Sequence, residues 1–131
     1  KKRIFKIREN PREKIIVSTQ VVEAGVDIDL DIVYRDFSPL DSIIQSAGRC
    51  NRNDKKRKGT VNIFKLRNEQ NKYDCIYIYS GLLLDVTNAI FNDKDIINEG
   101  DVLPLIDEYY RLIKKHSSKD TSREIIDAIN E

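Results

Sequence analysis

The chain has 131 residues, of which 40% are hydrophobic and 34% are charged, proportions that are ordinary for one folded domain and exclude disorder throughout. Lys and Arg number 23 against 22 Asp and Glu, so the charge balance gives no case for a protein that coats nucleic acid generally. Cys50 and Cys75 lack metal-ligand spacing, which favours reduced thiols in a cytoplasmic protein and predicts no metal site. Separately, no apolar run in the sequence approaches the roughly 18 residues that a membrane span needs.

The first quarter of the chain is predicted to hold one short strand and a sharp turn. Residues 1–14 are basic and polar and include Pro11, so we expect a polar lead-in there, either an edge strand or a disordered segment. Residues 15–18 form a brief β-rich run between polar residues, which is typical of a buried parallel strand. Gly25 then marks a position at which the backbone bends sharply or lets a ligand approach closely.

A strand, a helix and a third strand are predicted next. Residues 31–35 have the composition of a strand, and Ser38 as N-cap with Pro39 at the first helical position predicts the start of a helix. Four apolar side chains at helical spacing predict a helix face that packs on a sheet; they are Leu40, Ile43, Ile44 and Ala47. With a third strand at residues 60–66, this order of elements implies an α/β fold with a parallel sheet.

The C-terminal region, residues 73–131, is predicted to be mostly helical. Residues 73–91 fit both strand and helix patterns, and their length favours a helix. Residues 102–115 repeat the helical pattern, and Thr121 with Glu124 forms a capping box that predicts the start of a further helix. The apolar faces of these helices are expected to be internal core, with a docking surface as the alternative.

Two arginines are the best candidates for chemistry. Arg49 and Arg52 stand three residues apart, so both are expected to project from one side of the helix or from its end. The guanidinium group is planar, permanently charged and bidentate, which suits a phosphate, although cations at a helix C-terminus can also simply face solvent. The basic run at residues 55–58 has the same two interpretations, a solvated loop or a contact to a phosphate backbone.

Two sequence motifs decide between these interpretations. The segment 18–27 reads STQVVEAGVD and the segment 45–52 reads QSAGRCNR, and together they resemble motifs V and VI of a superfamily 2 helicase. With Ser38-Pro39-Leu40 and the acids that follow Gly25, they resemble more narrowly the CRISPR-associated helicase-nuclease of type I systems. The resemblance implies that residues 15–72 are an incomplete part of a second RecA-like domain, followed by a helical C-terminal region.

The resemblance also implies a role for each motif residue. Arg49 and Arg52 would contact the phosphates of ATP as catalytic groups, with Arg52 as the arginine finger. The ATP-binding residues would be Gly25, Asp27, Gln45 and Gly48. Thr19, and also Gln20, would contact the backbone of single-stranded DNA. The alternative for Asp27 and Asp29 is that both are solvated loop acids. Ser46 stands where many relatives have Arg, so any contact made by that Arg is not expected here.

The sequence contains no phosphate-binding loop of the GxxxxGK[ST] type and no magnesium-binding acidic motif. We therefore expect ATP, with its Mg²⁺, to be shared with a first RecA-like domain of a longer parent protein. The resemblance implies three partners, which are that domain, single-stranded DNA and an RNA-guided CRISPR surveillance complex. Binding to a membrane is not expected. The piece by itself is expected to be inactive and to self-associate through an exposed sheet edge. The rival hypothesis is a non-catalytic nucleic-acid-binding or docking module derived from such a helicase.

Overall fold

The computed structural model describes residues 15–19, 27–53, 58–92 and 94–130, and beyond residue 116 it describes only backbone. The chain divides into two compact units. One contains Lys1–Arg35 and Ile44–Asn62, and we call it the motif unit. The other contains Asp36–Ile43 and Ile63–Glu131, and we call it the helical unit. In the part of the chain that is described, no helix is both long and apolar enough to cross a membrane.

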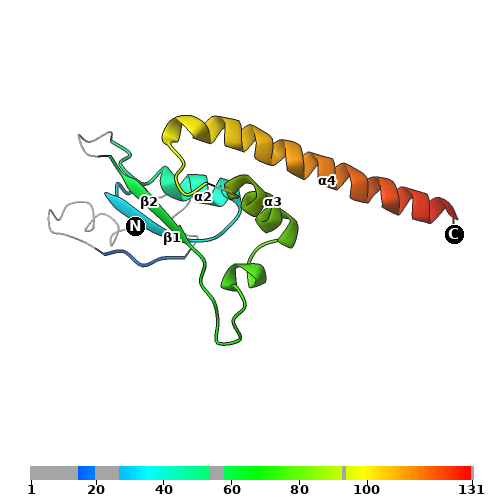
Figure 1. Cartoon of the computed structure of the whole chain (residues 1–131), viewed down its shortest axis with the longest axis horizontal. Coiled ribbons are helices and arrows are strands. Elements are labelled where there is room, and N and C mark those ends of the chain that lie inside the picture. Colours follow the sequence, from blue (N-terminus) through cyan, green and yellow to red (C-terminus); the bar gives the residue numbers. More distant parts are fainter. Residues whose placement is uncertain (1–14, 20–26, 54–57, 93, 131) are drawn as a thin grey trace. The chain divides into compact units, whose positions relative to one another are not determined.

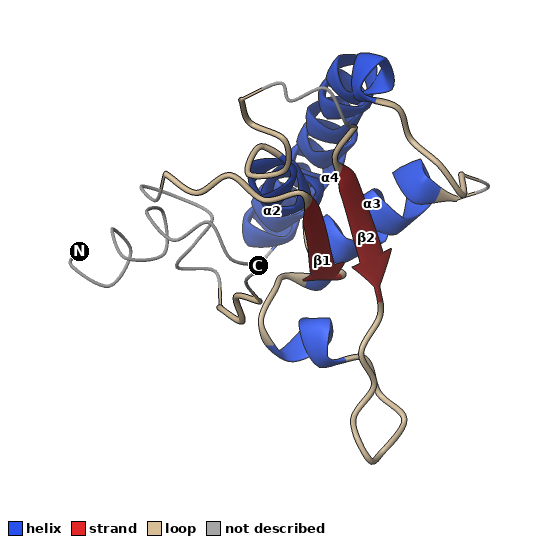
Figure 2. Cartoon of the chain, turned by 90° about the vertical axis from the view of Figure 1, so that its left-hand side faces the viewer, coloured by secondary structure: helices blue, strands red, loops and turns tan. Residues whose placement is uncertain are grey.

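Among the described residues, two neighbouring parallel strands form a sheet, and a helix connects them in the sequence (Figures 1 and 2). Strand β1 spans Ile32–Asp36 and strand β2 spans Thr60–Phe64. Near their starts, the backbone N–H of Thr60 donates to the carbonyl of Asp31 at 3.3 Å, and near their ends that of Phe37 donates to the carbonyl of Phe64 at 2.8 Å. The α/β class and the parallel pairing predicted from the sequence are therefore confirmed.

The connecting helix α2 spans Leu40–Ala47. Its first hydrogen bond runs from the N–H of Ile43 to the carbonyl of Pro39 at 3.1 Å, so the helix begins one residue later than the Pro39 start predicted from the sequence. Asp41 lies in the first turn, where the helix dipole favours a negative charge. Because the helix ends at Ala47, both arginines lie beyond its C-terminal end and not along its side.

One predicted strand is wrong. Residues 15–19 have no regular secondary structure, and the side chains of Ile15 and Val17 are 95% and 94% exposed. A β-rich run becomes a buried strand only when another strand pairs with it and a second layer covers it. Among the described residues, the sheet consists of β1 and β2 alone. Residues 15–18 therefore have no neighbouring strand to pair with, in spite of their strand-like composition.

The helical unit contains two short 3₁₀ helices and two α-helices. The 3₁₀ helices span Asp74–Tyr77 and Glu99–Asp101, while α3 spans Gly81–Phe91 and α4 spans Val102–Asn130. The mostly helical region is therefore confirmed, with two corrections. The first part of the predicted 73–91 helix is a 3₁₀ turn, and α4 continues through the predicted capping box without interruption, since a capping pattern cannot stop a helix that is already propagating.

A compact apolar core holds the helical unit together. Phe37, Cys75 and Leu84 are between 4% and 6% exposed and form one cluster, and the ring of Phe37 meets that of Phe91 edge to face with centroids 6.3 Å apart. Burying a side chain of this size contributes about 1.5–3 kcal/mol. Burial also raises the pKa of the Cys75 thiol, with the nearby Asp36 carboxylate adding to the effect, which fits a structural thiol in the core.

A buried polar network joins the start of α2 to α3. The hydroxyl of Thr87, which is fully buried, accepts the backbone N–H of Leu40 at 3.0 Å and donates to the carbonyl of Leu83 at 2.8 Å. Tyr109 of α4 is 1% exposed, and burial with the neighbouring Asp41 carboxylate raises its pKa to about 12. Thr87 thus satisfies a helix N-terminal donor that would otherwise be buried without a partner.

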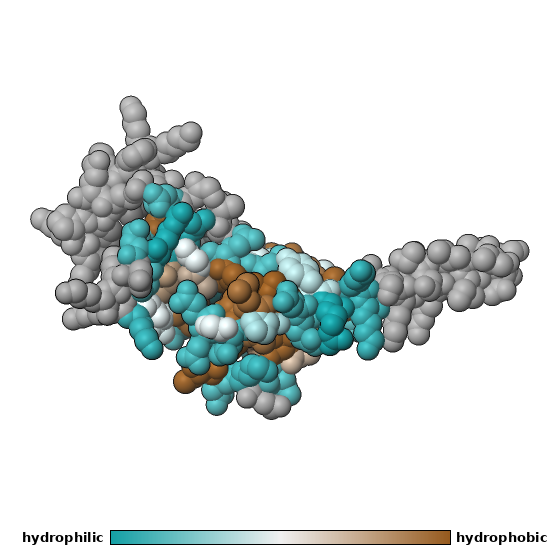
Figure 3. Space-filling view, turned by 90° about the horizontal axis from the view of Figure 1, so that it is seen from above, coloured by the Kyte–Doolittle hydropathy of each residue, from teal (hydrophilic) through white to brown (hydrophobic). Residues whose placement is uncertain are grey.

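Several large apolar side chains remain at the surface. Figure 3 shows brown apolar surface beside teal polar surface on one face of the described residues. On β1, Ile32 is 55% exposed and Tyr34 is 72% exposed, and on α4 Leu103 is 73% exposed. Single exposed apolar residues are common, but adjacent ones on a strand mark surface that can pack against further protein.

Candidate functional site

The turn that follows α2 carries the second motif and is bound to the segment before β1. The backbone N–H of Leu30 donates to the carbonyl of Arg49 at 2.9 Å, and the N–H of Asn51 donates to the carbonyl of Leu30 at 2.8 Å. Leu30 and Cys50 therefore form an isolated parallel bridge. Main-chain hydrogen bonds therefore join the second motif to the segment that follows the first motif in the sequence.

Asn51 turns the backbone sharply before Arg52. Its φ is 50°, in the left-handed region, which Asn tolerates better than most residues with a side chain. Gly59 allows the next segment to approach, because a Cβ there would lie 2.6 Å from the sulfur of Cys50 and 2.8 Å from Cβ of Asn51. The tight path of this turn thus depends on a left-handed Asn and on a glycine without a side chain.

Cys50 lies inside this turn as a structural thiol. Its sulfur is 3.4 Å from the carbonyl of Asp31 and 3.5 Å from that of Thr60. Burial raises the pKa of the Cys50 thiol, and the charges of Asp31 and Asp29 raise it further. Because the thiolate is the nucleophile and the metal ligand, a raised pKa makes Cys50 a poor candidate for either role.

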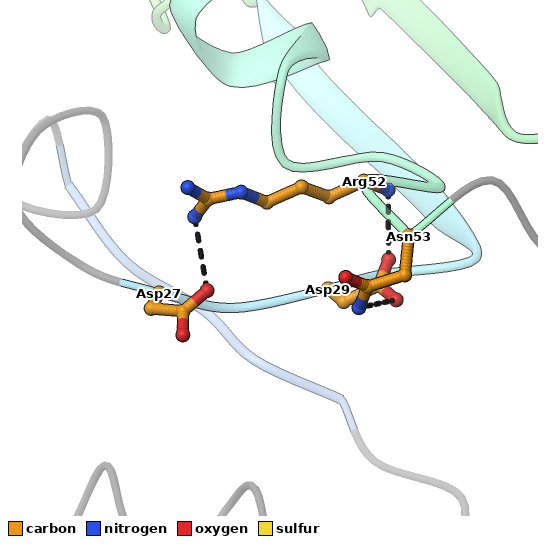
Figure 4. A network of polar contacts seen from close by, with 4 residues as sticks. All are labelled: Asp27, Asp29, Arg52 and Asn53. Atoms are coloured by element: carbon orange, nitrogen blue, oxygen red, sulfur yellow. Dashed lines mark hydrogen bonds and ion pairs between the residues drawn. The ribbon is translucent and has the colours of Figure 1, made fainter.

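Arg52 lies at the centre of a polar network (Figure 4). Its guanidinium group is 3.0 Å from a carboxylate oxygen of Asp27, and its backbone N–H donates to Oδ1 of Asp29 at 3.0 Å. The side-chain amide of Asn53 donates to the other oxygen, Oδ2, of Asp29 at 2.8 Å. The Arg52 and Asp27 side chains are 43% and 59% exposed, so both can still meet a ligand.

The structure brings some of the predicted site residues together. Arg52 and Asp27 are in contact, while Arg49 is half-buried at the end of α2, and Gln45 is exposed on that helix. Gly48 donates its N–H to the carbonyl of Ile44 at 2.9 Å and so closes the last helical turn.

Of the two predicted nucleic-acid-binding residues, the structure describes Thr19. Thr19 is exposed, and its carbonyl accepts the hydroxyl of Ser18 at 3.0 Å. Gln20 and Gly25 lie outside the described residues, as does most of the basic run at 55–58. The roles of these residues stay predictions.

Two residues of this network, Asp29 and Asn53, are not predicted as site residues from the sequence. The sequence offers only the alternative of a solvated loop acid for Asp29, yet both of its carboxylate oxygens accept hydrogen bonds from the turn that carries the second motif. The alternation Asp27-Ile28-Asp29 offered a signal. Ile28 is buried at 5% exposure, while the carboxylates of its neighbours Asp27 and Asp29 contact residues 52 and 53.

The parallel strand–helix–strand unit defines the class of fold as α/β, and the two sequence motifs at its edge resemble those of superfamily 2 helicases. The comparisons give the narrower family. The family described as "CRISPR-associated nuclease/helicase Cas3, C-terminal" matches residues 1–55.

Curated relatives carry the same name. The CRISPR-associated nuclease/helicase Cas3 of Streptococcus thermophilus is 34% identical over 106 residues, which cover 76% of this chain and 11% of that protein. The one from Haloferax volcanii is 58% identical over 38 residues, covering 29% of this chain and 4% of that protein. The chain therefore spans only a small part of the curated relatives that it matches.

Solved structures agree on the fold. The crystal structure of T. fusca Cas3-ADP matches with a TM-score of 0.63 at 21% identity, covering 96% of this chain and 17% of that one. The crystal structure of T. fusca Cas3-ATP matches with a TM-score of 0.62 over 96% of this chain and 16% of that one. The resemblance stated from the motifs is confirmed, and the chain is related to the C-terminal helicase region of CRISPR-associated nuclease/helicases.

Proposed function

We propose that this segment supplies the arginine-finger side of the ATP site in an ATP-driven DNA helicase of CRISPR antiviral defence. The observation that supports this most directly is the contact between Arg52 and Asp27. It brings the last residue of the second motif against the last residue of the first. Relatives named as nuclease/helicases support the same class of activity.

The described residues fit one side of a nucleotide site. The exposed guanidinium of Arg52 can exchange its carboxylate partner for a phosphate, because both are bidentate acceptors. Asp27 offers an exposed carboxylate to a ribose hydroxyl. At Gly48 a Cβ would meet only backbone oxygens at 3.6 Å, so local packing does not require glycine there, and close approach of a ligand is a reason for it.

Each motif residue has a proposed task. Arg52 binds the terminal phosphate and neutralises its growing charge, Arg49 assists, and Gln45 orients the site. When bound, ATP supplies the phosphoanhydride bond whose cleavage drives the motor, and its Mg²⁺ is held by the first RecA-like domain of the parent protein. Thr19 and Gln20 contact the backbone of single-stranded DNA.

The wider context is part of the same proposal. The parent protein acts in the cytoplasm on DNA marked by an RNA-guided CRISPR surveillance complex. Closure of the two RecA-like domains around ATP couples hydrolysis to movement along the strand.

The decisive experiment replaces Arg52 in the full-length protein that contains this segment. Arg52→Ala should lower DNA-stimulated ATP hydrolysis by about 10³- to 10⁵-fold, the effect of removing an arginine finger, while single-strand binding survives. Arg111→Ala is the matched control, because Arg111 is exposed and pairs with Glu108 on α4. Unchanged hydrolysis in Arg52→Ala would favour the non-catalytic nucleic-acid-binding or docking module instead.

The isolated segment gives two further tests of the proposal. By itself it should hydrolyse no ATP, and turnover dependent on Arg52 would overturn the division of the site between two domains. The exposed Ile32 and Tyr34 on β1 support association of isolated copies through the sheet. Light scattering that shows a monomer over a wide concentration range would contradict that association.

A further inference from the structure

The Asp29 carboxylate holds the backbone that carries Arg52. Its Oδ1 accepts the N–H of Arg52 at 3.0 Å and its Oδ2 accepts the side-chain amide of Asn53 at 2.8 Å (Figure 4). Hydrogen bonds to an ionised acceptor are shorter and stronger than neutral ones. Asp29 thus fixes two successive residues of the turn with one side chain, from a position 23 residues earlier in the sequence.

A second contact fixes the backbone directly before Arg52. Asn51, directly before Arg52, has a φ of 50° and donates its N–H to the carbonyl of Leu30 at 2.8 Å. Since Leu30 is the residue after Asp29, one short segment holds the backbone N–H groups of Asn51 and Arg52 and the side chain of Asn53. The main chain at Arg52 is therefore defined independently of where its side chain points.

The guanidinium end of Arg52 is held much more weakly. Its ion pair with Asp27 joins side chains that are 43% and 59% exposed, and solvent-exposed pairs of that kind contribute little to stability. A phosphate can displace such a partner at little cost. The two acids therefore act on different parts of Arg52, Asp29 on the backbone and Asp27 on the exchangeable charged end.

We propose that Asp29 is a positioning residue that sets the approach of the Arg52 guanidinium to the phosphate through the backbone of the turn. This inference rests on the proposed function, in which Arg52 contacts the nucleotide. In this proposal the effect of Asp29 on the phosphate passes through the backbone of Arg52. A displacement of about 1 Å at a catalytic group can cost about 100-fold in rate, so removing this anchor should be visible in hydrolysis.

The first experiment separates kcat from KM in the full-length protein. Asp29→Ala should lower kcat for DNA-stimulated ATP hydrolysis by about 10- to 100-fold. KM for ATP should stay within about twofold, as expected for an interaction made only in the transition state. Asp29→Asn should retain most activity, because its amide oxygen still accepts the Arg52 N–H. Asp85→Ala, at an exposed acid on α3, is the matched control and should behave as wild type.

A double-mutant cycle tests whether the effect passes through Arg52. Adding Asp29→Ala to Arg52→Lys should lower kcat far less than adding it to wild type, because coupled residues are not additive. An equal loss in both backgrounds would show a general structural defect and overturn the inference. If Asp29→Ala does not fold, Asp29→Glu replaces it, since it keeps the charge but displaces the carboxylate by one methylene. Wild-type kcat in Asp29→Glu would also overturn the inference.

The outcomes also distinguish this inference from the proposed function. Full hydrolysis in Arg52→Ala would remove both, because Arg52 would then have no catalytic task. Loss of hydrolysis in Arg52→Ala with wild-type kinetics in Asp29→Ala would leave the proposed function standing and remove the inference alone.

Discussion

The motif unit and the helical unit are stabilised by different interactions. Among the described residues of the motif unit, Ile28 is the one buried apolar side chain, and the contacts that define its shape are hydrogen bonds of 2.8–3.0 Å to Leu30 and Asp29. The helical unit buries Phe37, Leu84 and Tyr109 in apolar surroundings.

This difference separates stability from function. Apolar burial is non-directional and supplies most of the free energy of folding. Hydrogen bonds contribute less net free energy but fix the orientation of the groups that they join. The proposed contact between Arg52 and a phosphate depends on such an orientation. Substitutions in the helical unit should therefore change stability most, whereas those in the motif unit should change the geometry of Arg52.

The largest expected effect on stability is at Tyr109. Tyr109→Ala should lower the free energy of unfolding of the helical unit by about 3–5 kcal/mol, as for other large aromatic truncations, measured by urea denaturation followed by circular dichroism. Tyr110→Ala is the matched control, because Tyr110 is 55% exposed. Similar losses in both variants would contradict the assignment of Tyr109 to the core.

Alkaline pH should weaken the same core. The pKa of Tyr109 is about 12 in the folded protein and 10.0 ordinarily, so the folded state holds the phenolic proton more tightly. Its contribution is complete below pH 10 and is lost as pH rises from 10 toward 12. Urea denaturation across that range should show the loss, and Tyr109→Phe should reduce it. An unchanged slope in Tyr109→Phe would assign the effect to other groups.

Removal of the Thr87 hydroxyl comes next. Thr87→Val should cost about 1–3 kcal/mol, because the buried N–H of Leu40 loses its acceptor. Thr87→Ser keeps the hydroxyl and should cost less than Thr87→Val. Thermal denaturation compares the two, and equal midpoints would show that the hydrogen bond to α2 contributes nothing measurable.

The smallest expected effect on stability lies in the motif unit. Asn51→Ala should destabilise by about 1–2 kcal/mol, the cost of a left-handed conformation for a residue with a Cβ. Asn51→Gly should be close to neutral, since glycine adopts a positive φ without strain. In the full-length protein, Asn51→Ala should lower ATP hydrolysis more than its small effect on thermal stability suggests. If hydrolysis and stability change in proportion, the turn has no special task in placing Arg52.

The sequence by itself determined the class of the protein and its motifs. The apolar spacing of α2, the strand composition on either side of it and the two motif strings are local, so they predicted the parallel α/β unit and the helicase resemblance correctly. The helical C-terminal region was predictable for the same reason, because periodicity over 102–115 reports one helix face.

Only the tertiary structure decided how distant residues are used. Residues 15–18 have strand composition but no paired strand among the described residues, and Tyr77 with its neighbours forms a 3₁₀ turn where local patterns allowed helix or strand. Asp29 acquired its task from a contact 23 residues away, and Thr87 caps α2 from 47 residues away. Contacts of this kind form only when the chain between the two residues has folded and brought them together. Local propensities and residue spacing therefore cannot predict them.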